Sequence, residues 1–113
     1  MQDSKIVIIT GAARGIGYGI AECFAAKHHK LVLADMDLEE AEKAATTLKT
    51  ESGAADTLAV ACDVTERDSV QTMVEKTVET FGRVDVLVNN AGICPFVDVM
   101  DMSPEVWQKT VDV

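Results

Sequence analysis

The feature that most constrains this chain is a glycine-rich segment that directly follows a short apolar run. The apolar run covers residues 5–10, and the segment reads Thr10-Gly11-Ala12-Ala13-Arg14-Gly15-Ile16-Gly17. An amphipathic stretch comes next, so the glycines are predicted to form the turn between a buried strand and a helix. The first backbone N–H groups of a helix have no partner inside it, and glycines allow an anion to approach them. The segment therefore predicts an anion-binding turn of the kind that holds a pyrophosphate.

Apolar runs and amphipathic stretches alternate along the rest of the chain. The runs predict strands over residues 5–10, 31–35, 57–62 and 84–89. Helices are predicted over residues 15–28, 37–53 and 65–82, and again after Ser103. The strands are apolar throughout instead of at every second residue, which indicates a parallel sheet covered on both faces. Right-handed connections then give an α/β, Rossmann-like fold of the doubly wound type.

The helical spacing of apolar residues predicts which faces of the helices are buried. The residues predicted to face the sheet are Ile16, Ile20, Ala21 and Phe24 in the first helix and Leu38, Ala41, Ala45 and Leu48 in the second. Asp37, with Glu40 three positions on, is predicted to cap the second helix. Basic residues at positions 27–30 are predicted to lie at the negative end of the first helix dipole.

The charge of the chain argues against nucleic acid and membranes as partners. Its 113 residues carry a formal net charge of −9, which repels phosphate backbones and anionic lipid surfaces. Apolar runs such as residues 6–9 are far shorter than the roughly 20 residues of a membrane-spanning helix. The chain also begins without the apolar segment of an export signal. We therefore expect a soluble, cytoplasmic protein.

The cysteines and histidines predict neither a disulfide framework nor a metal site. Cys23, Cys62 and Cys94 are odd in number and spread along the chain, which argues against disulfides or zinc and fits the reducing cytosol. They are expected to be small, mostly buried thiols. His28 and His29 lack Cys, His or carboxylate partners at a spacing suited to a metal.

An acidic residue at the end of the second predicted strand bears on the choice of ligand. Asp35 follows Gly17 by 18 residues, close to the roughly 20 expected for a carboxylate that binds the adenosine ribose of a dinucleotide. Such a carboxylate accepts hydrogen bonds from ribose hydroxyls and repels a 2′-phosphate, which favours NAD over NADP. Arg14 keeps NADP open, because a guanidinium there can contact a 2′-phosphate. The other interpretation of Asp35 is a strand-end carboxylate in a turn.

The Gly-x-x-x-Gly-x-Gly spacing, with Thr10 in front and Asn89-Asn90-Ala91-Gly92 after the fourth strand, resembles the short-chain dehydrogenase/reductase family over essentially the whole chain. The resemblance implies a sheet that begins in the order 3-2-1-4 and is incomplete here, with residues 10–17 around the pyrophosphate. It places Asp63 and Val64 by the adenine, although both also suit a plain turn after a strand. The candidate cofactor-binding residues are Gly11, Arg14, Gly15, Ile16, Gly17, Asp35, Asp63, Val64, Asn90, Ala91 and Gly92.

The resemblance also implies a catalytic Tyr-x-x-x-Lys pair, assisted by a Ser and an Asn, that this chain does not match. Its one tyrosine, Tyr18, lies in the first predicted helix and is followed four residues later by Glu22. Residues 107–113 resemble the family stretch that leads into the catalytic Asn. No catalytic residue is therefore assigned, and the 113 residues alone are expected to be inactive.

Residues 1–113 are thus expected to be the NAD-binding half-domain of an oxidoreductase that interconverts a secondary alcohol and a ketone by hydride transfer. Its expected partners are the nicotinamide cofactor and a small-molecule substrate, and the apolar edge strand at 84–89 favours a homo-oligomer. The alternative is a noncatalytic nucleotide-binding or dimerisation module. A P-loop enzyme is disfavoured, because the segment Gly15-Ile16-Gly17 lacks the Lys and Ser/Thr that hold phosphates and Mg²⁺.

Overall fold

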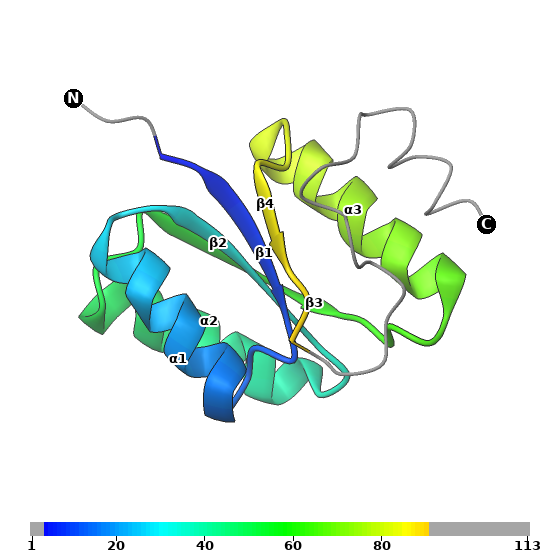
Figure 1. Cartoon of the computed structure of the whole chain (residues 1–113), viewed down its shortest axis with the longest axis horizontal. Coiled ribbons are helices and arrows are strands. Elements are labelled where there is room, and N and C mark those ends of the chain that lie inside the picture. The colour runs from blue at the N-terminus through cyan, green and yellow to red at the C-terminus, as the bar shows by residue number, and fades with distance from the viewer. Residues whose placement is uncertain (1–3, 91–113) are drawn as a thin grey trace.

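Strands and helices alternate along the chain as its apolar pattern predicts, in a computed structural model that describes residues 4–90 (Figure 1). The elements are β1 (Ile6–Thr10), α1 (Gly15–Ala26), β2 (Lys30–Asp35), α2 (Leu38–Glu51), β3 (Asp56–Ala61), α3 (Arg67–Phe81) and β4 (Val86–Val88). The last strand is shorter than predicted, because only its three central residues pair with β1. The helix predicted after Ser103 lies outside the described residues.

The four strands form one parallel sheet in the order β3-β2-β1-β4. β1 lies between β2 and β4, with Ile8 opposite Val32 on one side and opposite Leu87 on the other. The chain moves outward from β1 to β3 and then returns to the far side of β1 to form β4. The predicted Rossmann-like, doubly wound sheet and its 3-2-1-4 order are confirmed.

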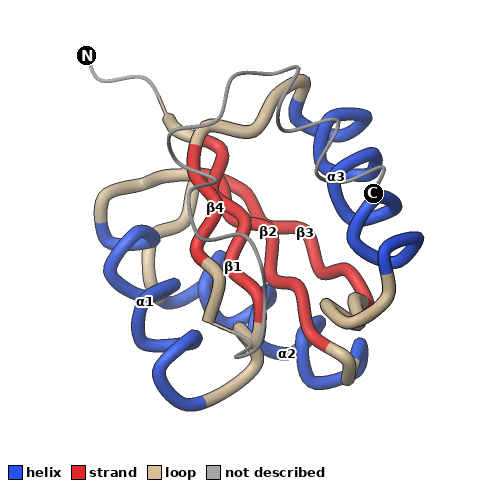
Figure 2. Tube along the Cα trace, turned by 45° about the vertical axis from the view of Figure 1, so that its right-hand side comes forward, coloured by secondary structure: helices blue, strands red, loops and turns tan. Residues whose placement is uncertain are grey.

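Helices cover both faces of the sheet, as predicted: α1 and α2 lie on one face and α3 on the other (Figure 1, Figure 2). Successive residues of a strand point to opposite faces, so β1 contributes to two cores. The core beside α1 and α2 includes Val7, Ile9, Ala21, Ala25, Leu31, Leu33, Ala45 and Leu48. The core beside α3 includes Ile8, Val32, Val60, Val70, Met73, Val74 and Leu87. This double burial explains why β1 is apolar along its length and not at alternate positions.

The first helix turns a different face to the sheet from the one predicted. Its buried residues are Gly17, Ala21 and Ala25, which are small and four residues apart, whereas Ile16 is 76% exposed. The cause is the close approach of Gly17 to the turn before the helix, described below, which fixes the rotation of α1 about its axis. The partly buried residues that still border this core include Ile20 and Phe24. The prediction that Ile16 faces the sheet is therefore wrong.

Three helix boundaries lie two residues inside the predicted ones, at the end of α1, the end of α2 and the start of α3. α1 ends at Ala26 because His28 adopts a left-handed backbone conformation with a φ of 65°. The basic residues 27–30 therefore begin at the C-cap, Lys27, and lie just beyond the last turn of α1 rather than within it. α3 begins at Arg67 because Thr65 is held in a turn, where its backbone N–H and its hydroxyl both donate to Asp63.

The start of α2 matches the predicted cap but not the predicted burial. Asp37 Oδ1 accepts a hydrogen bond from the Glu40 N–H at 3.1 Å, which confirms Asp37 as the N-cap. Leu38 is 41% exposed, and Ala44 is buried in addition to the predicted residues of the stripe. The first turn of a helix often projects beyond the sheet it covers, and the apolar stripe of α2 accordingly begins one turn later.

Two expectations drawn from composition can be compared with the described residues. Cys62 is buried, but Cys23 is exposed on α1, so the expectation of buried thiols is wrong for Cys23. Cys94 lies outside the described residues. Among residues 4–90, none of the three helices has both the length and the hydropathy needed to cross a lipid bilayer.

Candidate functional site

The carboxyl ends of the four strands meet at one edge of the sheet, because all strands are parallel. In open α/β sheets, ligands bind at this edge, beside the strand where the strand order reverses. That strand is β1, and the candidate residues in the turn after it and at the start of α1 are Gly11, Arg14, Gly15, Ile16 and Gly17. The described candidates at or just after the ends of the other strands are Asp35, Asp63, Val64 and Asn90. The predicted candidates Ala91 and Gly92 lie outside the described residues.

The three glycines of the turn are required for different reasons. Gly11 and Gly15 have φ values of 62° and 63°, a left-handed conformation that side chains disfavour. No heavy atom lies within 4 Å of a Cβ added at Gly15, so the space in front of that residue is open. A Cβ on Gly17 would instead overlap the carbonyl oxygen of Gly11 and lie 2.6 Å from Asn90 Nδ2. Gly17 therefore permits close packing, whereas Gly15 sits where a ligand has room.

The N-terminus of α1 lacks the side-chain cap that α2 has. Arg14 occupies the N-cap position with an extended backbone, and its side chain makes no capping hydrogen bond. The first turn of α1 contains no acidic residue, and the first hydrogen bond into the helix joins Tyr18 N–H to the carbonyl of Arg14 at 3.4 Å. The preceding N–H groups carry the partial positive charge of a helix N-terminus and are suited to an anion.

The Asp35 side chain joins the glycine turn to the end of β2 by hydrogen bonds. Its Oδ2 accepts a hydrogen bond from Ala13 N–H at 3.1 Å, and its Oδ1 accepts one from Asp37 N–H at 3.1 Å. Ala12 N–H adds a bond to the carbonyl of Ala34 at 3.3 Å. A carboxylate can accept about four hydrogen bonds, so Asp35 retains capacity for two ribose hydroxyls. The turn role and the ligand role proposed from sequence are therefore compatible.

A hydrogen-bond network joins the turn after β1 to the turn after β4. The buried Thr10 hydroxyl donates to Asn89 Oδ1 at 3.2 Å and accepts from Asn90 N–H at 3.0 Å. Asn90 Nδ2 donates in turn to the carbonyl of Gly11 at 3.3 Å. The sequence pattern includes Thr10, Asn89 and Asn90, but it does not predict that these residues bond to one another. The network holds Asn90 against the glycine turn.

Comparison with known proteins assigns the chain to a family. The family described as short chain dehydrogenase matches residues 5–113. The chain belongs to the short-chain dehydrogenase family. L-rhamnose 1-dehydrogenase (NAD(P)(+)) of Azotobacter vinelandii is 43% identical over 109 residues, which cover 95% of this chain and 43% of that protein.

Solved structures of short-chain dehydrogenases share the fold. L-sorbose reductase from Gluconobacter frateurii, complexed with NADPH and L-sorbose, has a TM-score of 0.76 and 38% identity, covering 94% of this chain and 40% of the reductase. A short-chain dehydrogenase/reductase from Burkholderia phymatum in complex with NAD has a TM-score of 0.70 and 38% identity, covering 75% of this chain and 30% of that protein. The chain thus spans about two fifths or less of the length of these relatives.

Arg14 of this short-chain dehydrogenase chain lies on the β2 side of the glycine turn. Its Nη2 is 3.9 Å from Asp37 Oδ2, in an ion pair whose side chains are 75% and 47% exposed. Met36, between Asp35 at the end of β2 and Asp37, is also largely exposed. The Arg14 guanidinium and the Asp37 carboxylate therefore lie side by side near the place where the sequence predicts that the adenosine ribose binds.

Asp63 and Val64 lie in a turn that is closed by its own hydrogen bonds. Asp63 Oδ1 accepts from Thr65 Oγ1 at 2.6 Å and from Thr65 N–H at 2.9 Å, and these bonds hold the pKa of Asp63 below its usual value. Asp63 N–H donates to Ser69 Oγ at 2.8 Å, and Val64 packs against the core beside α3. Asp63 and Val64 thus have a structural role in this turn, and their contact with an adenine stays a prediction.

Tyr18 is a half-buried residue of α1. It borders the core beneath α1. Burial, followed by the charges of Glu22 and Glu51, raises the pKa of Tyr18 above its usual value. A general acid or base works best with a pKa near the operating pH. This agrees with the absence of a lysine four residues after Tyr18.

Removing the Thr10 hydroxyl is expected to destabilise the chain. Thr10→Val keeps the shape of the side chain but leaves the Asn90 N–H without its acceptor, so we expect a loss of about 1–2 kcal/mol in the free energy of unfolding. Urea denaturation followed by circular dichroism measures this. The matched control is Thr46→Val on the exposed face of α2, where the hydroxyl donates only to the Glu42 carbonyl. Equal losses in the two variants would contradict a structural role of the network.

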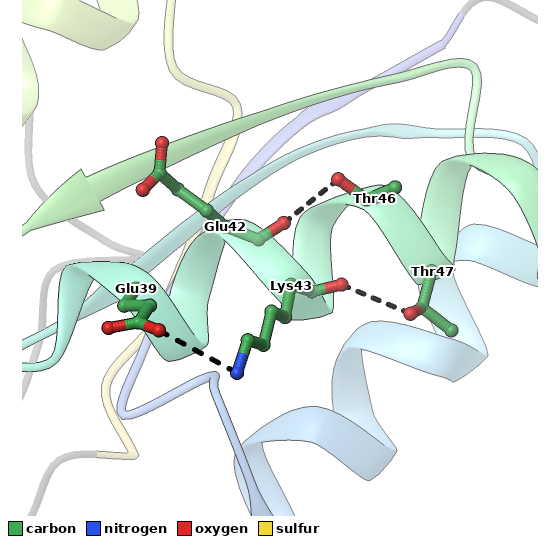
Figure 3. A pocket seen from close by; sticks show the side chains of 5 residues that line it. All are labelled: Glu39, Glu42, Lys43, Thr46 and Thr47. Atoms are coloured by element: carbon green, nitrogen blue, oxygen red, sulfur yellow. Dashed lines mark hydrogen bonds and ion pairs between the residues drawn. The ribbon is translucent and has the colours of Figure 1, made fainter.

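A pocket on the exposed side of α2 belongs to a single helix and not to this site (Figure 3). The residues that line it are Glu39, Glu42, Lys43, Thr46 and Thr47. Lys43 Nζ pairs with Glu39 at 3.8 Å and with Glu40 at 3.7 Å. The two threonine hydroxyls donate to backbone carbonyls one turn earlier. Its polar groups largely satisfy one another, and none of the cofactor candidates lines it.

Proposed function

We propose that this chain is the NAD-binding part of an oxidoreductase that interconverts a secondary alcohol and a ketone. The observation that carries the proposal is Asp35, whose carboxylate closes the glycine turn against the end of β2. Membership of the short-chain dehydrogenase family supports the reaction class. The chain covers less than half of its relatives, so the substrate and the complete reaction are assigned to the whole protein and not to residues 4–90 alone.

The residues at the carboxyl ends of the strands are suited to bind the pyrophosphate and the adenosine ribose of a dinucleotide. The uncapped start of α1 offers N–H donors and a positive dipole to the pyrophosphate, and the open space at Gly15 lets it approach. Asp35 offers its remaining acceptor capacity to the adenosine ribose. Ile16, exposed next to the turn, would offer an apolar contact to a bound cofactor. When bound, the nicotinamide group supplies the chemistry of hydride transfer.

The charges at the end of β2 favour NAD over NADP. A 2′-phosphate would lie near the Asp35 carboxylate and would be repelled by it. Arg14, the cation on this side of the turn, is 3.9 Å from a second carboxylate, that of Asp37. The relatives include a protein complexed with NADPH and one complexed with NAD, so the family alone does not decide between the cofactors. A cytoplasmic location and a homo-oligomeric assembly remain parts of this proposal.

Replacing Asp35 is the direct test of the proposed cofactor. The unmodified chain is expected to bind NADH more tightly than NADPH in a fluorescence titration. Asp35→Asn keeps one acceptor oxygen but loses the charge, and we expect it to weaken NADH binding roughly tenfold while weakening NADPH binding less. The discrimination between the two cofactors should therefore fall.

Asp68→Asn is the matched control, because it removes one exposed negative charge from the first turn of α3, away from the glycine turn. It should leave both affinities nearly unchanged. Circular dichroism of all variants confirms that the chain stays folded. Tighter binding of NADPH than of NADH by the unmodified chain would overturn the NAD assignment, and no binding of either would overturn the proposed function.

A further inference from the structure

We propose that Asp37 is a positioning residue that holds Arg14 beside the turn between β2 and α2, and so favours NAD over NADP. The proposal rests on the proposed function, since it assumes that Asp35 faces the adenosine ribose of a bound dinucleotide. It assigns to Asp37 a role beyond capping α2. The two carboxylate oxygens of Asp37 have different partners, the Glu40 N–H and the Arg14 guanidinium.

One oxygen of Asp37 fixes the orientation of the other. Oδ1 accepts from the Glu40 N–H at 3.1 Å and ties the carboxylate to the first turn of α2. Oδ2 lies 3.9 Å from Arg14 Nη2. The Asp37 backbone is fixed as well, because its N–H donates to Asp35 Oδ1 at 3.1 Å. The helix cap therefore presents a negative charge to Arg14 in a constant direction.

Arg14 is free to change partners, whereas Asp37 is not. The Arg14 side chain is 75% exposed, and its backbone stands at the N-cap of α1, next to the glycine turn. Two nearby carboxylates of α2, Glu39 and Glu40, pair with Lys43. Among the ion pairs of the described part of the chain, the one that includes Arg14 is formed with Asp37. The direction of the Arg14 guanidinium is thus set by this contact.

An exposed ion pair of this kind is weak, so a ligand can compete for Arg14. A 2′-phosphate carries up to two negative charges and forms strong bonds with guanidinium. It must take Arg14 from Asp37 while it is repelled by Asp37 itself. Loss of the Asp37 charge therefore favours NADP in two ways, by releasing Arg14 and by removing the repulsion. Only the first of these depends on Arg14.

The test is Asp37→Asn, with the dissociation constants of NADH and NADPH measured by fluorescence titration of the 113-residue chain. Asparagine is as good an N-cap as aspartate, so α2 should keep its start. Because a released guanidinium can form charge-assisted bonds with the 2′-phosphate, whereas the repulsion by Asp37 is largely screened by solvent, we expect the ratio of the two constants to shift roughly three- to tenfold toward NADPH. NADH affinity should change less than about twofold, because the site of the ribose hydroxyls is unaltered.

Two further variants separate the positioning role from its alternatives. Glu39→Gln removes a negative charge from the same helix turn, where that carboxylate pairs with Lys43 and not with Arg14, and should leave the ratio nearly unchanged. In an Arg14→Gln background, Asp37→Asn should shift the ratio less than about twofold, because there is no guanidinium to release.

The possible results are distinguishable. A full shift that persists in the Arg14→Gln background would mean that Asp37 acts by repulsion alone, and the positioning role would be wrong. It would also be wrong if Asp37→Asn moved the ratio no more than Glu39→Gln does while NADH still bound. Binding of neither dinucleotide to the unmodified chain would overturn the proposed function, and the role of Asp37 with it.

Discussion

Gly17→Ala is expected to lower the free energy of unfolding by about 2–3 kcal/mol, because the added methyl group has no room. Its Cβ would overlap the carbonyl oxygen of Gly11 and lie 2.9 Å from the carbonyl carbon of the same residue. These are backbone atoms in the turn that Asp35 and Asn90 hold in place. Either α1 must move off the sheet or the turn must deform. Urea denaturation at neutral pH, followed by circular dichroism, measures the loss.

Gly19→Ala is the matched control in the same helix. No heavy atom lies within 4 Å of a Cβ built on Gly19. Replacing a glycine by alanine inside a helix typically stabilises it by about 0.5–1 kcal/mol, since alanine loses less backbone entropy on folding. The two substitutions, two residues apart, should therefore have opposite signs. If Gly17→Ala were neutral or stabilising, the close contact of α1 with the glycine turn would be disproved.

Asp85→Ala is expected to destabilise the chain by about 2–3 kcal/mol at neutral pH, because it leaves charged and buried partners without their acceptor. Asp85 Oδ2 accepts from the Ile6 N–H at 2.8 Å, and both oxygens accept from Arg83 Nε at 3.0 and 2.9 Å. The Asp85 N–H donates to the carbonyl of Ile6 at 2.9 Å. Arg83 also reaches the carbonyl of Ser4 at 3.2 Å. The carboxylate thus fastens β4 to the start of β1.

The effect of Asp85→Ala should depend on pH. Burial alone would raise the pKa of Asp85, but the Ile6 N–H and Arg83 outweigh it and hold the pKa below its usual value. A carboxylate of this kind stabilises the fold fully above the unfolded pKa of about 3.9 and loses that contribution as the pH falls through the lower, folded pKa. The difference in stability between the unmodified chain and Asp85→Ala should therefore be largest at neutral pH and shrink below about pH 4.

Glu42→Gln on the exposed face of α2 serves as the control for Asp85→Ala. In Figure 3 the Glu42 carboxylate points away from the other lining residues, and the dashed line drawn to Glu42 ends on its backbone carbonyl. Substitution there should change the stability by less than about 0.5 kcal/mol at any pH. A loss in Asp85→Ala that is no larger than in Glu42→Gln, or one that is the same at pH 7 and pH 3, would contradict the role given to the Asp85 carboxylate.

The sheet could be predicted from sequence because its signals are local. A continuous apolar run indicates a strand buried on both faces, and the glycine turn marks where β1 passes into α1. The Asp37 cap is also local, since its partner Glu40 is three residues away. Short-range chemistry of this kind determines the element order, and the doubly wound topology follows from general rules of chain connection.

The contacts that sequence did not predict join residues far apart in the chain. Thr10 and Asn90 are 80 residues apart, and Ile6 and Asp85 are 79 apart. The predicted rotation of α1 was wrong for a different reason: apolar spacing favours Ile16 on the buried face, but the close approach of Gly17 to Gly11 in the preceding turn, and to Asn90, places Gly17 there instead. The pairing of Arg14 with Asp37 depends equally on two loops that meet only in the folded chain.

The long separation between β1 and β4 has a consequence for how the chain folds. β1 pairs with β2 across 24 residues, as for Ile6 and Lys30, but with β4 across 79, as for Val7 and Val86. Closing a longer loop costs more entropy, so the longer pairing forms later. We expect the β1-α1-β2 unit to form early, with Asp35 already bound to the glycine turn. Asn90 reaches the glycine turn only when β4 docks, so the contact with Asp35 exists before the contact with Asn90, and the last folding step completes the candidate site.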